Sequence, residues 1–259
     1  MTLPLPAFRE QFAAPGWEVV DFISDLHLSE DTPRGFDAWS RWMRDTTADA
    51  VFILGDLFDA WVGDDARHSG FEARCAQTLS AAAARRYVGV MVGNRDFLMG
   101  PEFLSACGAE QLEDPTVLVI EGERFLLSHG DELCVGDTEY QQFRRMVRSE
   151  KWRHDFLALP LPERRLRAQQ MRRQSTLHNK NRPAGQWFDV DHATALQWMR
   201  SANTPRLIHG HTHRPETEQL APGFVRHVLS DWELDHAPLA RGEVLRWQHG
   251  GLTRVPINP

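Results

Sequence analysis

The sequence predicts an α/β fold in which two packed mixed β-sheets are flanked by helices. Residues 19–92 alternate short apolar runs with helical patterns, which is typical of a layered α/β unit. Strand-like runs return at 117–127, 225–229 and 243–248, and they call for a second sheet. With 259 residues, the chain fits a single domain, residues 1–259, that carries an insert.

The individual elements follow from the spacing of apolar residues. The first strand covers Val19 to Ile23, and the aromatic residues of 36–47 recur at helical spacing. In chain order we then expect a strand at 51–54, an Ala-rich helix at 71–84, a strand at 87–92, a short helix opened by Pro101, and a hairpin at 117–127.

A helical insert, or cap, is predicted over about residues 138–199. It mixes aromatic residues with arginines, and Leu159-Pro-Leu161-Pro separates its first part from a second helix that ends near Asn179. Between Gln141 and Arg182 there are twelve Lys and Arg against three acids, which leaves −16 for the rest of a chain with net charge −7. This is a basic insert on an acidic body, although a solvated helical face is the simpler explanation.

The composition also limits the cellular setting. Cys75, Cys107 and Cys134 are widely spaced and odd in number, which fits a reducing compartment better than a disulfide framework. Residues 1–16 do not resemble a signal peptide, and no stretch approaches the roughly 20 apolar residues of a membrane-spanning helix. We therefore expect a cytoplasmic protein.

Side chains with metal-binding chemistry follow several of the predicted strands. Asp25 and His27 end the first strand, and residues i and i+2 of an extended segment point to one face. Alone, Asp-x-His is more often a capping Asp and a surface His. Three later stretches repeat the pattern after an apolar run; they are Gly55-Asp56-Leu-Phe-Asp59, Gly93-Asn94-Arg95-Asp96, and the pair Ser128-His129-Gly130-Asp131 with His209-Gly-His211-Thr-His213-Arg214. Ligands at the ends of neighbouring strands can converge on one crevice.

Taken in order, these motifs resemble those of the calcineurin-like metallophosphoesterases over about residues 19–214. The third motif of that superfamily normally reads Gly-Asn-His-Asp or Gly-Asn-His-Glu, and here Arg95 replaces the His. With that Arg, the sequence resembles the UDP-2,3-diacylglucosamine pyrophosphohydrolases of lipid A synthesis. The resemblance implies two packed sheets with a cap, and a site for two divalent metal ions.

A carboxylate has two oxygens, so Asp56 is the natural bridge between two ions. By resemblance, Asp25, His27 and His213 complete one site, and Asn94, His129 and His211 complete the other. Oxygen and nitrogen donors without a thiolate allow Mn, Fe or Zn, and we expect two Mn²⁺. Two ions with Asp25, Asp56 and a bridging hydroxide leave a charge of about +1, which favours an anionic phosphate. Asp56, Asn94, Arg95 and His211 are the expected catalytic residues.

Arg95 is the informative departure. A His there could protonate a leaving group, whereas an Arg keeps its proton and can only bind and stabilise phosphate oxygens. UMP is a leaving group that needs little protonation, so Arg95 suits pyrophosphate cleavage. The alternative is a surface Arg paired with Asp96. Asp59, Asp96 and Asp131 are expected to cap loops, and His209 to orient a neighbouring ligand.

The resemblance implies a nucleotide-lipid substrate whose pyrophosphate is attacked by water at the α-phosphorus, yielding UMP and 2,3-diacylglucosamine 1-phosphate. Its implied contacts are Asn94, Arg95, Asp137, Ser175, Asn179 and His211, with either Lys180 or Arg182. The basic and apolar insert also suits the anionic cytoplasmic face of the inner membrane. An acidic body would repel nucleic acid, and no obligatory protein partner is evident. Hydrolysis of another nucleotide diphosphate, or a metal-free scaffold, is the alternative.

Overall fold

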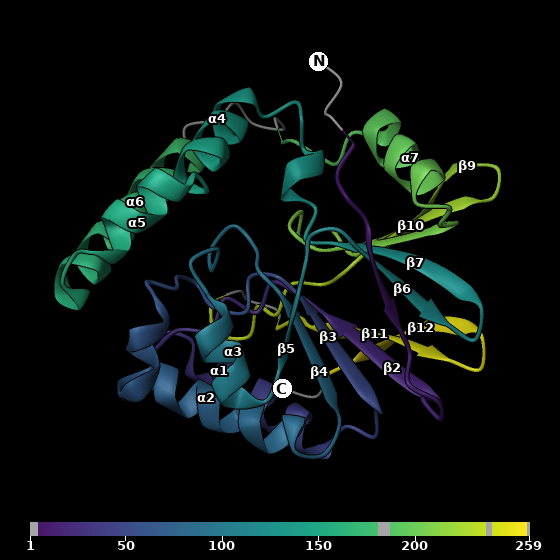
Figure 1. Cartoon of the computed structure of the whole chain (residues 1–259), viewed down its shortest axis with the longest axis horizontal. Helices are drawn as coiled ribbons and strands as arrows, with labels where there is room; N and C mark the ends of the chain where they lie inside the picture. The colour runs from purple at the N-terminus through teal and green to yellow at the C-terminus, as the bar shows by residue number, and fades with distance from the viewer. Residues whose placement is uncertain (1–4, 181–186, 237–239, 258–259) are drawn as a thin grey trace.

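The computed structural model describes residues 5–180, 187–236 and 240–257, with the backbone alone for 178–180. It contains two six-stranded sheets, which we call sheets I and II (Figure 1). Sheet I has the order β12-β11-β2-β3-β4-β5, and sheet II the order β1-β6-β7-β8-β10-β9. Both are mixed, because each joins parallel and antiparallel pairs. The predicted α/β fold with two mixed sheets is confirmed.

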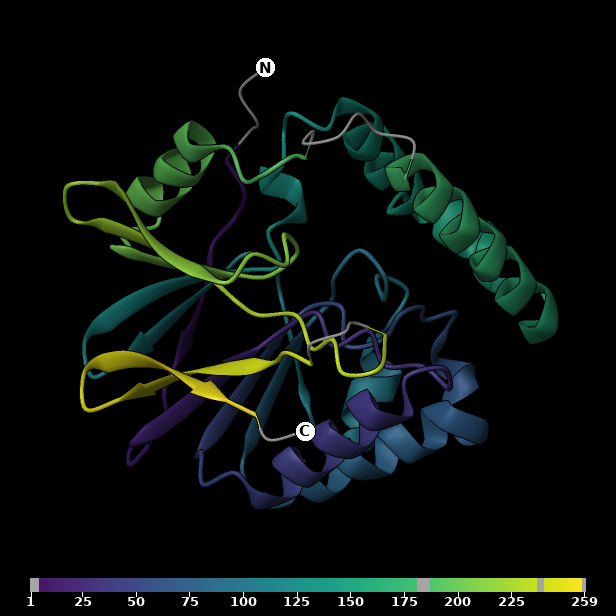
Figure 2. The same cartoon turned by 180° about the vertical axis from the view of Figure 1, so that it is seen from behind.

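Sheet I is built from β2 (Val19–Ile23), β3 (Ala50–Leu54), β4 (Tyr87–Met91), β5 (Glu110–Leu112), β11 (Glu243–Gln248) and β12 (Gly251–Pro256). Strands β2 to β5 run parallel to one another. Every residue of β3 is buried, as in a sheet covered on both faces. Helices α1 (Pro33–Asp45), α2 (Gly70–Ala83) and α3 (Pro101–Cys107) cover its outer face (Figure 2). On α1, Phe36, Trp39 and Met43 are buried at helical spacing, as predicted.

Sheet II is built from β1 (Arg9–Phe12), β6 (Thr116–Ile120), β7 (Glu123–Ser128), β8 (Arg206–His209), β9 (Glu216–Ala221) and β10 (Phe224–Val228). β6 and β7 form the predicted hairpin. The inner face of sheet II packs on sheet I through aromatic residues, and the rings of Phe22 and Phe125 are 6.4 Å apart. Helix α7 (His192–Ser201) buries Trp198 and Met199 against this sheet.

Helices α4 (Thr138–Val147), α5 (Glu150–Leu157) and α6 (Leu161–Lys180) project from the sandwich, and we call them the arm (Figures 1 and 2). The prolines at 160 and 162 lie at the α5–α6 break, as predicted. The insert was expected to reach residue 199, whereas α7 packs on sheet II. The division into one domain with an insert stays a prediction.

Arg164 fixes α6 to the body. Its side chain is 4% exposed and donates to the carbonyls of Val62 and Leu159, and it pairs with the carboxylate of Asp65. Gly63 leaves room for the guanidinium, because a Cβ there would lie 2.3 Å from Arg164 Nη1. Its φ of +126° is a second reason for glycine at this position. One buried side chain therefore joins the arm to the loop that follows β3.

We predict that Arg164→Ala lowers the free energy of unfolding by about 3 kcal/mol, because two carbonyls lose their donor. Arg165→Ala is the matched control. Arg165 pairs with Glu72 at 2.9 Å and is 43% exposed, so its loss should cost less than about 1 kcal/mol. Urea unfolding of both variants measures the difference. Equal costs would contradict the anchoring role of Arg164.

Candidate metal centre

The predicted ligands lie at the ends of strands from both sheets. Asp25 and Asp56 follow β2 and β3 of sheet I, and Asn94 follows β4. His129 follows β7 of sheet II, and His211 and His213 follow β8. Neighbouring strands within each group run parallel, so their carboxyl ends meet at one edge of the sandwich.

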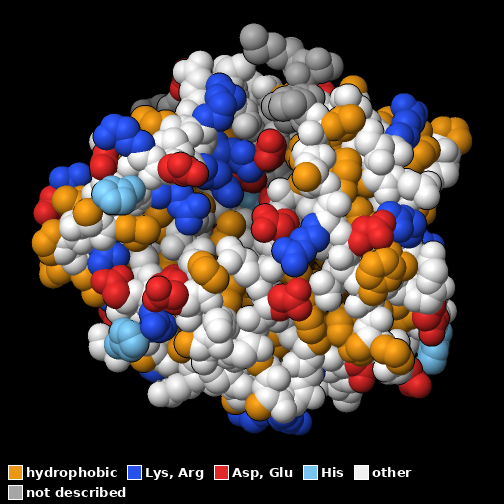
Figure 3. All heavy atoms as spheres, viewed as in Figure 1, with side chains coloured by type: hydrophobic (Ala, Val, Ile, Leu, Met, Phe, Trp, Pro, Cys, Tyr) orange, Lys and Arg blue, Asp and Glu red, His pale blue; other side chains and the backbone are white. Residues whose placement is uncertain are grey.

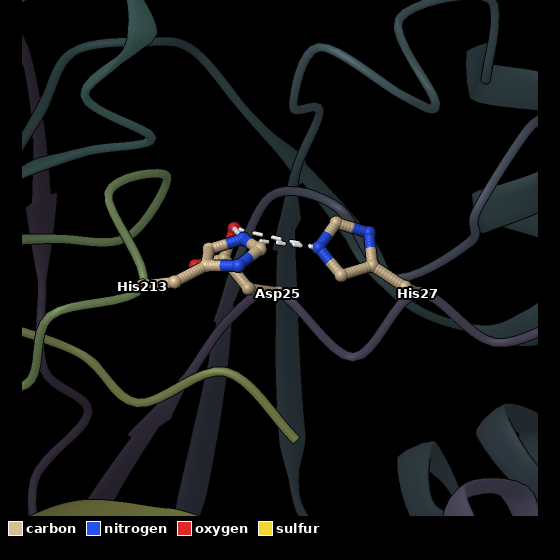
Figure 4. A group of neighbouring side chains, drawn as sticks. All are labelled: Asp25, His27 and His213. Atoms are coloured by element: carbon tan, nitrogen blue, oxygen red, sulfur yellow. Dashed lines mark hydrogen bonds and ion pairs between the residues drawn. The ribbon is translucent and has the colours of Figure 1, made fainter. Parts of the chain in front are cut away.

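One group consists of Asp25, His27 and His213 (Figure 4). The Nε2 atoms of the two histidines are 3.1 Å apart, and His213 Nε2 is 3.3 Å from Asp25 Oδ1. Asp25 is fully buried, and among the described residues no group donates a hydrogen bond to its Oδ1. Two imidazole nitrogens and an unsatisfied carboxylate oxygen face one point, which is what a cation site requires.

The second group contains Asp56, Asn94, His129 and His211. Asn94 lies 2.9 Å from His129 Nε2 and 2.8 Å from His211 Nδ1. Asp56 Oδ1 is 3.7 Å from His129 Nε2, while its Oδ2 is 3.8 Å from His27 Nδ1 in the first group. The two oxygens of Asp56 therefore face different histidines, as a bridging carboxylate would.

The backbone presents these side chains differently from the prediction. Extended segments were expected for Asp25 with His27 and for His211 with His213, and this was wrong. Among the described residues eight non-glycine residues have positive φ, and five of them are Asp25, His27, Asp56, His211 and His213, at 49–67°. Such backbone is costly for L-residues and is concentrated at functional sites.

Two glycines that precede ligand residues, Gly93 and Gly210, allow the backbone to pack closely on the carboxylates of Asp56 and Asp25. A Cβ on Gly93 would lie 2.1 Å from Asp56 Oδ1, and one on Gly210 would lie 2.3 Å from Asp25 Oδ2. Neither position has room for a side chain. This explains the glycine that separates the strand from the ligand residue at these two positions.

The histidines differ in charge. Burial alone would lower the pKa of His129, but the carboxylates of Asp56 and Asp131 raise it to about 9. Burial is likewise outweighed at His213, whose pKa the Asp25 carboxylate raises to about 9. Burial lowers the pKa of His27 and His211 to about 3. Two of the four rings therefore carry protons at neutral pH that a cation would displace.

The two buried carboxylates, Asp25 and Asp56, show how a cation would stabilise the cluster. Burial raises the pKa of Asp56 well above its ordinary value, and the nearby carboxylates of Asp96 and Asp25 raise it further. Burial also opposes ionisation of Asp25, yet the His213 ring holds its pKa below the usual range. Oxygen and nitrogen donors around two buried acids fit a pair of divalent ions.

Arg95 lies at the edge of this cluster. Its Nε is 3.8 Å from Asp56 Oδ2, and its backbone N–H donates to Asp56 Oδ1 at 2.8 Å. Asp96 is not its partner, because that carboxylate accepts from the N–H groups of Gly93 and Leu57. Asp96 therefore caps loops, as expected, while the Arg95 guanidinium stays directed at the cluster.

Asp59 and Asp131 were expected to cap loops, but their carboxylates bind side chains of the arm instead. Asp59 receives both Nε and Nη2 of Arg172 on α6. Asp131 is fully buried and accepts from Tyr140 Oη at 2.5 Å and Arg144 Nε at 2.9 Å on α4. Sequence reasoning missed these arm residues. The signal was available, because Tyr140, Arg144 and Arg148 recur every four residues and so share one helix face.

Two further predicted substrate contacts, Asp137 and Ser175, lie at the arm. Asp137 is the N-cap of α4, where its Oδ1 accepts from the N–H of Tyr140. Ser175 is exposed on α6. Arg182 and the side chains of Asn179 and Lys180 lie outside the described residues, so the choice between the two basic residues stays a prediction.

Residues 19–215 match the family model described as calcineurin-like phosphoesterase. The chain belongs to this family of metal-dependent phosphoesterases, as its motifs predicted. It is 41% identical over 244 residues to a UDP-2,3-diacylglucosamine hydrolase of Chromobacterium violaceum, covering 92% of this chain and 98% of that one. Identity to the protein of the same name from Ralstonia nicotianae is 42%, with 92% of each chain covered. The protein of the same name from Neisseria meningitidis serogroup A is 41% identical, with 91% of this chain and 97% of that one covered.

Proposed function

We propose that the chain hydrolyses the pyrophosphate bond of UDP-2,3-diacylglucosamine in lipid A biosynthesis. Water attacks the α-phosphorus, and the products are UMP and 2,3-diacylglucosamine 1-phosphate. The observation that carries this proposal is the convergence of seven oxygen and nitrogen donors beside Arg95 and under an arginine-rich arm. Relatives that share about two fifths of its residues carry this enzyme name.

We assign the metal ligands as the sequence motifs suggest, with Mn²⁺ as the ion. Asp25, His27 and His213 hold one ion, and Asn94, His129 and His211 the other, with Asp56 shared. When bound, two divalent ions clamp a phosphoryl group and supply a nucleophilic water near neutral pH. The 3.7 and 3.8 Å approaches of Asp56 to two different histidines support the shared role.

Arg95 acts on the phosphate itself in this proposal. Its guanidinium carries a fixed charge and paired N–H donors, so it binds phosphate oxygens and stabilises the charge that develops on them. Asn94 and His211 lie beside it and orient the same group. Asp137, Ser175 and Asn179, with Lys180 or Arg182, bind the glucosamine and nucleotide parts.

The arm also offers a place for acyl chains. A groove of about 620 Å³ lies between α5 and α6, and its lining combines Trp152, Phe156 and Met171 with the charged and amide side chains of Asp155, Arg167, Gln170 and Gln174. Ligand sites combine apolar and polar side chains, and this lining holds both. A soluble nucleotide sugar has no alkyl chain to pack against these apolar side chains.

The function is tested by UMP release from UDP-2,3-diacylglucosamine and from UDP-N-acetylglucosamine, with Mn²⁺, Zn²⁺ or EDTA. We expect release from the lipid substrate with Mn²⁺, none with EDTA, and at least a hundredfold lower kcat/KM for the soluble sugar. In ¹⁸O-water the label should appear in UMP. Equal turnover of both substrates, or of a dinucleoside polyphosphate, favours the broader nucleotide hydrolase. Wild-type protein that binds no metal favours a scaffold.

We predict that Arg95→His lowers kcat by about 10² to 10³, because a fixed donor to the phosphate oxygens is lost. A slope should also appear in the pH profile near the pKa of the new imidazole. Arg44→Ala is the control, since Arg44 is exposed and pairs with its neighbour Asp45. Full activity of Arg95→His with an unchanged pH profile would contradict the role given to Arg95.

We further propose that the arm docks on the anionic cytoplasmic face of the inner membrane. Exposed apolar side chains recur along it among arginines, and they are Phe143, Met146, Leu157, Leu166 and Leu177. Figure 3 shows hydrophobic and basic side chains, with acidic ones among them, over the arm at the left of the molecule. Within the described residues no helix is long and apolar enough to span a bilayer.

Sedimentation with vesicles tests this docking. We expect binding to phosphatidylglycerol vesicles that weakens with salt, because each Lys or Arg near the surface contributes about 1 kcal/mol, and little binding to neutral vesicles. Met146→Glu with Leu166→Glu should reduce it. Phe12→Glu is the control, because Phe12 is 62% exposed on β1 of the body. Equal binding to both vesicle types would contradict the proposal.

A further inference from the structure

Asp231 lies beside the metal cluster although it comes after the last ligand motif. It follows β10, which pairs in parallel with β8, so the loop after β10 lies next to the loop that carries His213. Backbone bonds fix this loop, because Trp232 N donates to Asp25 O at 3.1 Å and Leu229 N donates to His209 O at 2.7 Å. The Asp231 side chain is only 7% exposed.

The two ring nitrogens of His213 face different partners. Its Nε2 points into the cluster, 3.3 Å from Asp25 Oδ1 and 3.1 Å from His27 Nε2. Its Nδ1 points the other way and lies 3.6 Å from Asp231 Oδ2. A carboxylate on this side favours the proton on Nδ1, which leaves the Nε2 lone pair free for a cation.

The Asp231 carboxylate is held in place from behind. Arg241 binds it through two parallel contacts, Nε to Oδ1 at 2.8 Å and Nη2 to Oδ2 at 2.5 Å. Arg241 is itself fixed, since its backbone N–H and C=O bond Glu233 across an isolated β-bridge. A row of contacts through Arg241, Asp231 and His213 therefore runs from the surface to the cluster.

We propose that Asp231 is a positioning residue for the metal centre. It orients the His213 ring and sets the tautomer that binds a cation through Nε2, and Arg241 keeps the Asp231 carboxylate directed at Nδ1. The inference rests on the metal centre proposed above. It assigns a role in that centre to a loop outside the matched residues 19–215.

The test measures Mn²⁺ binding to metal-depleted protein by calorimetry and by the electron paramagnetic resonance of free Mn²⁺. We expect Asp231→Asn to weaken one of the two sites 10- to 100-fold, the usual effect of removing a carboxylate behind a ligating His. Arg241→Gln should weaken the same site less. The double variant should bind like Asp231→Asn, because Arg241 acts through Asp231.

Asp21→Asn is the matched control. Asp21 is a buried carboxylate held by Arg246 through the same two-contact geometry, at 2.7 and 2.8 Å, but it faces none of the ligand histidines. It should lower the melting temperature and leave both Mn²⁺ affinities unchanged. Equal loss of affinity in Asp21→Asn and Asp231→Asn would show a general loss of stability and would overturn the inference.

Two further outcomes separate this inference from the proposal on which it rests. Two Mn²⁺ ions bound by wild-type protein, with unchanged affinity in Asp231→Asn, would overturn the role of Asp231 alone. No Mn²⁺ bound by wild-type protein would overturn the metal centre together with this role. If Asp231→Asn does not fold, Arg241→Gln decides, and an unchanged affinity in that variant overturns the inference.

Discussion

The proposed metal centre depends on a costly placement of two carboxylates. Asp25 and Asp56 are 0% and 1% exposed, and burial opposes their ionisation. Histidines reduce the repulsion, and left-handed backbone at five of the ligands adds local strain. The extensive core between and around the two sheets allows the fold to tolerate this arrangement. A pair of cations would convert the same arrangement from a local cost to a stabilising contact.

The charge asymmetry of the sequence has a second meaning in the structure. The basic insert reads as a solvated face, yet several of its arginines bind acids of the body. Arg144 pairs with Asp131, Arg164 with Asp65, and Arg172 with Asp59. Asp59 lies three residues after Asp56, and Asp131 two residues after His129. The arm is therefore attached to the same loops that carry the proposed ligands.

Much of the fold was predictable because its signals are local. The all-apolar run of β3 and the helical spacing of Phe36, Trp39 and Met43 specify their elements without reference to distant residues. The candidate site was predicted from ligand-type residues that follow apolar strands, in the order typical of calcineurin-like phosphoesterases. The positive φ angles were not predictable, because they depend on how each loop packs against its neighbours. Strands β1 and β9 carry few buried residues, so periodicity did not reveal them.

Asp231 escaped detection for a similar reason, because its contact with the His213 loop depends on how β8 and β10 pair and not on a local motif. The sites that receive the arm have a further consequence. Asp59, Asp65 and Asp131 belong to the body, so the cap is not a self-contained module. A chimaera that moved residues 138–180 onto another phosphoesterase would transfer these arginines without the aspartates that pair with them. A transfer of the arm between such enzymes would have to carry these three acids along with the helices.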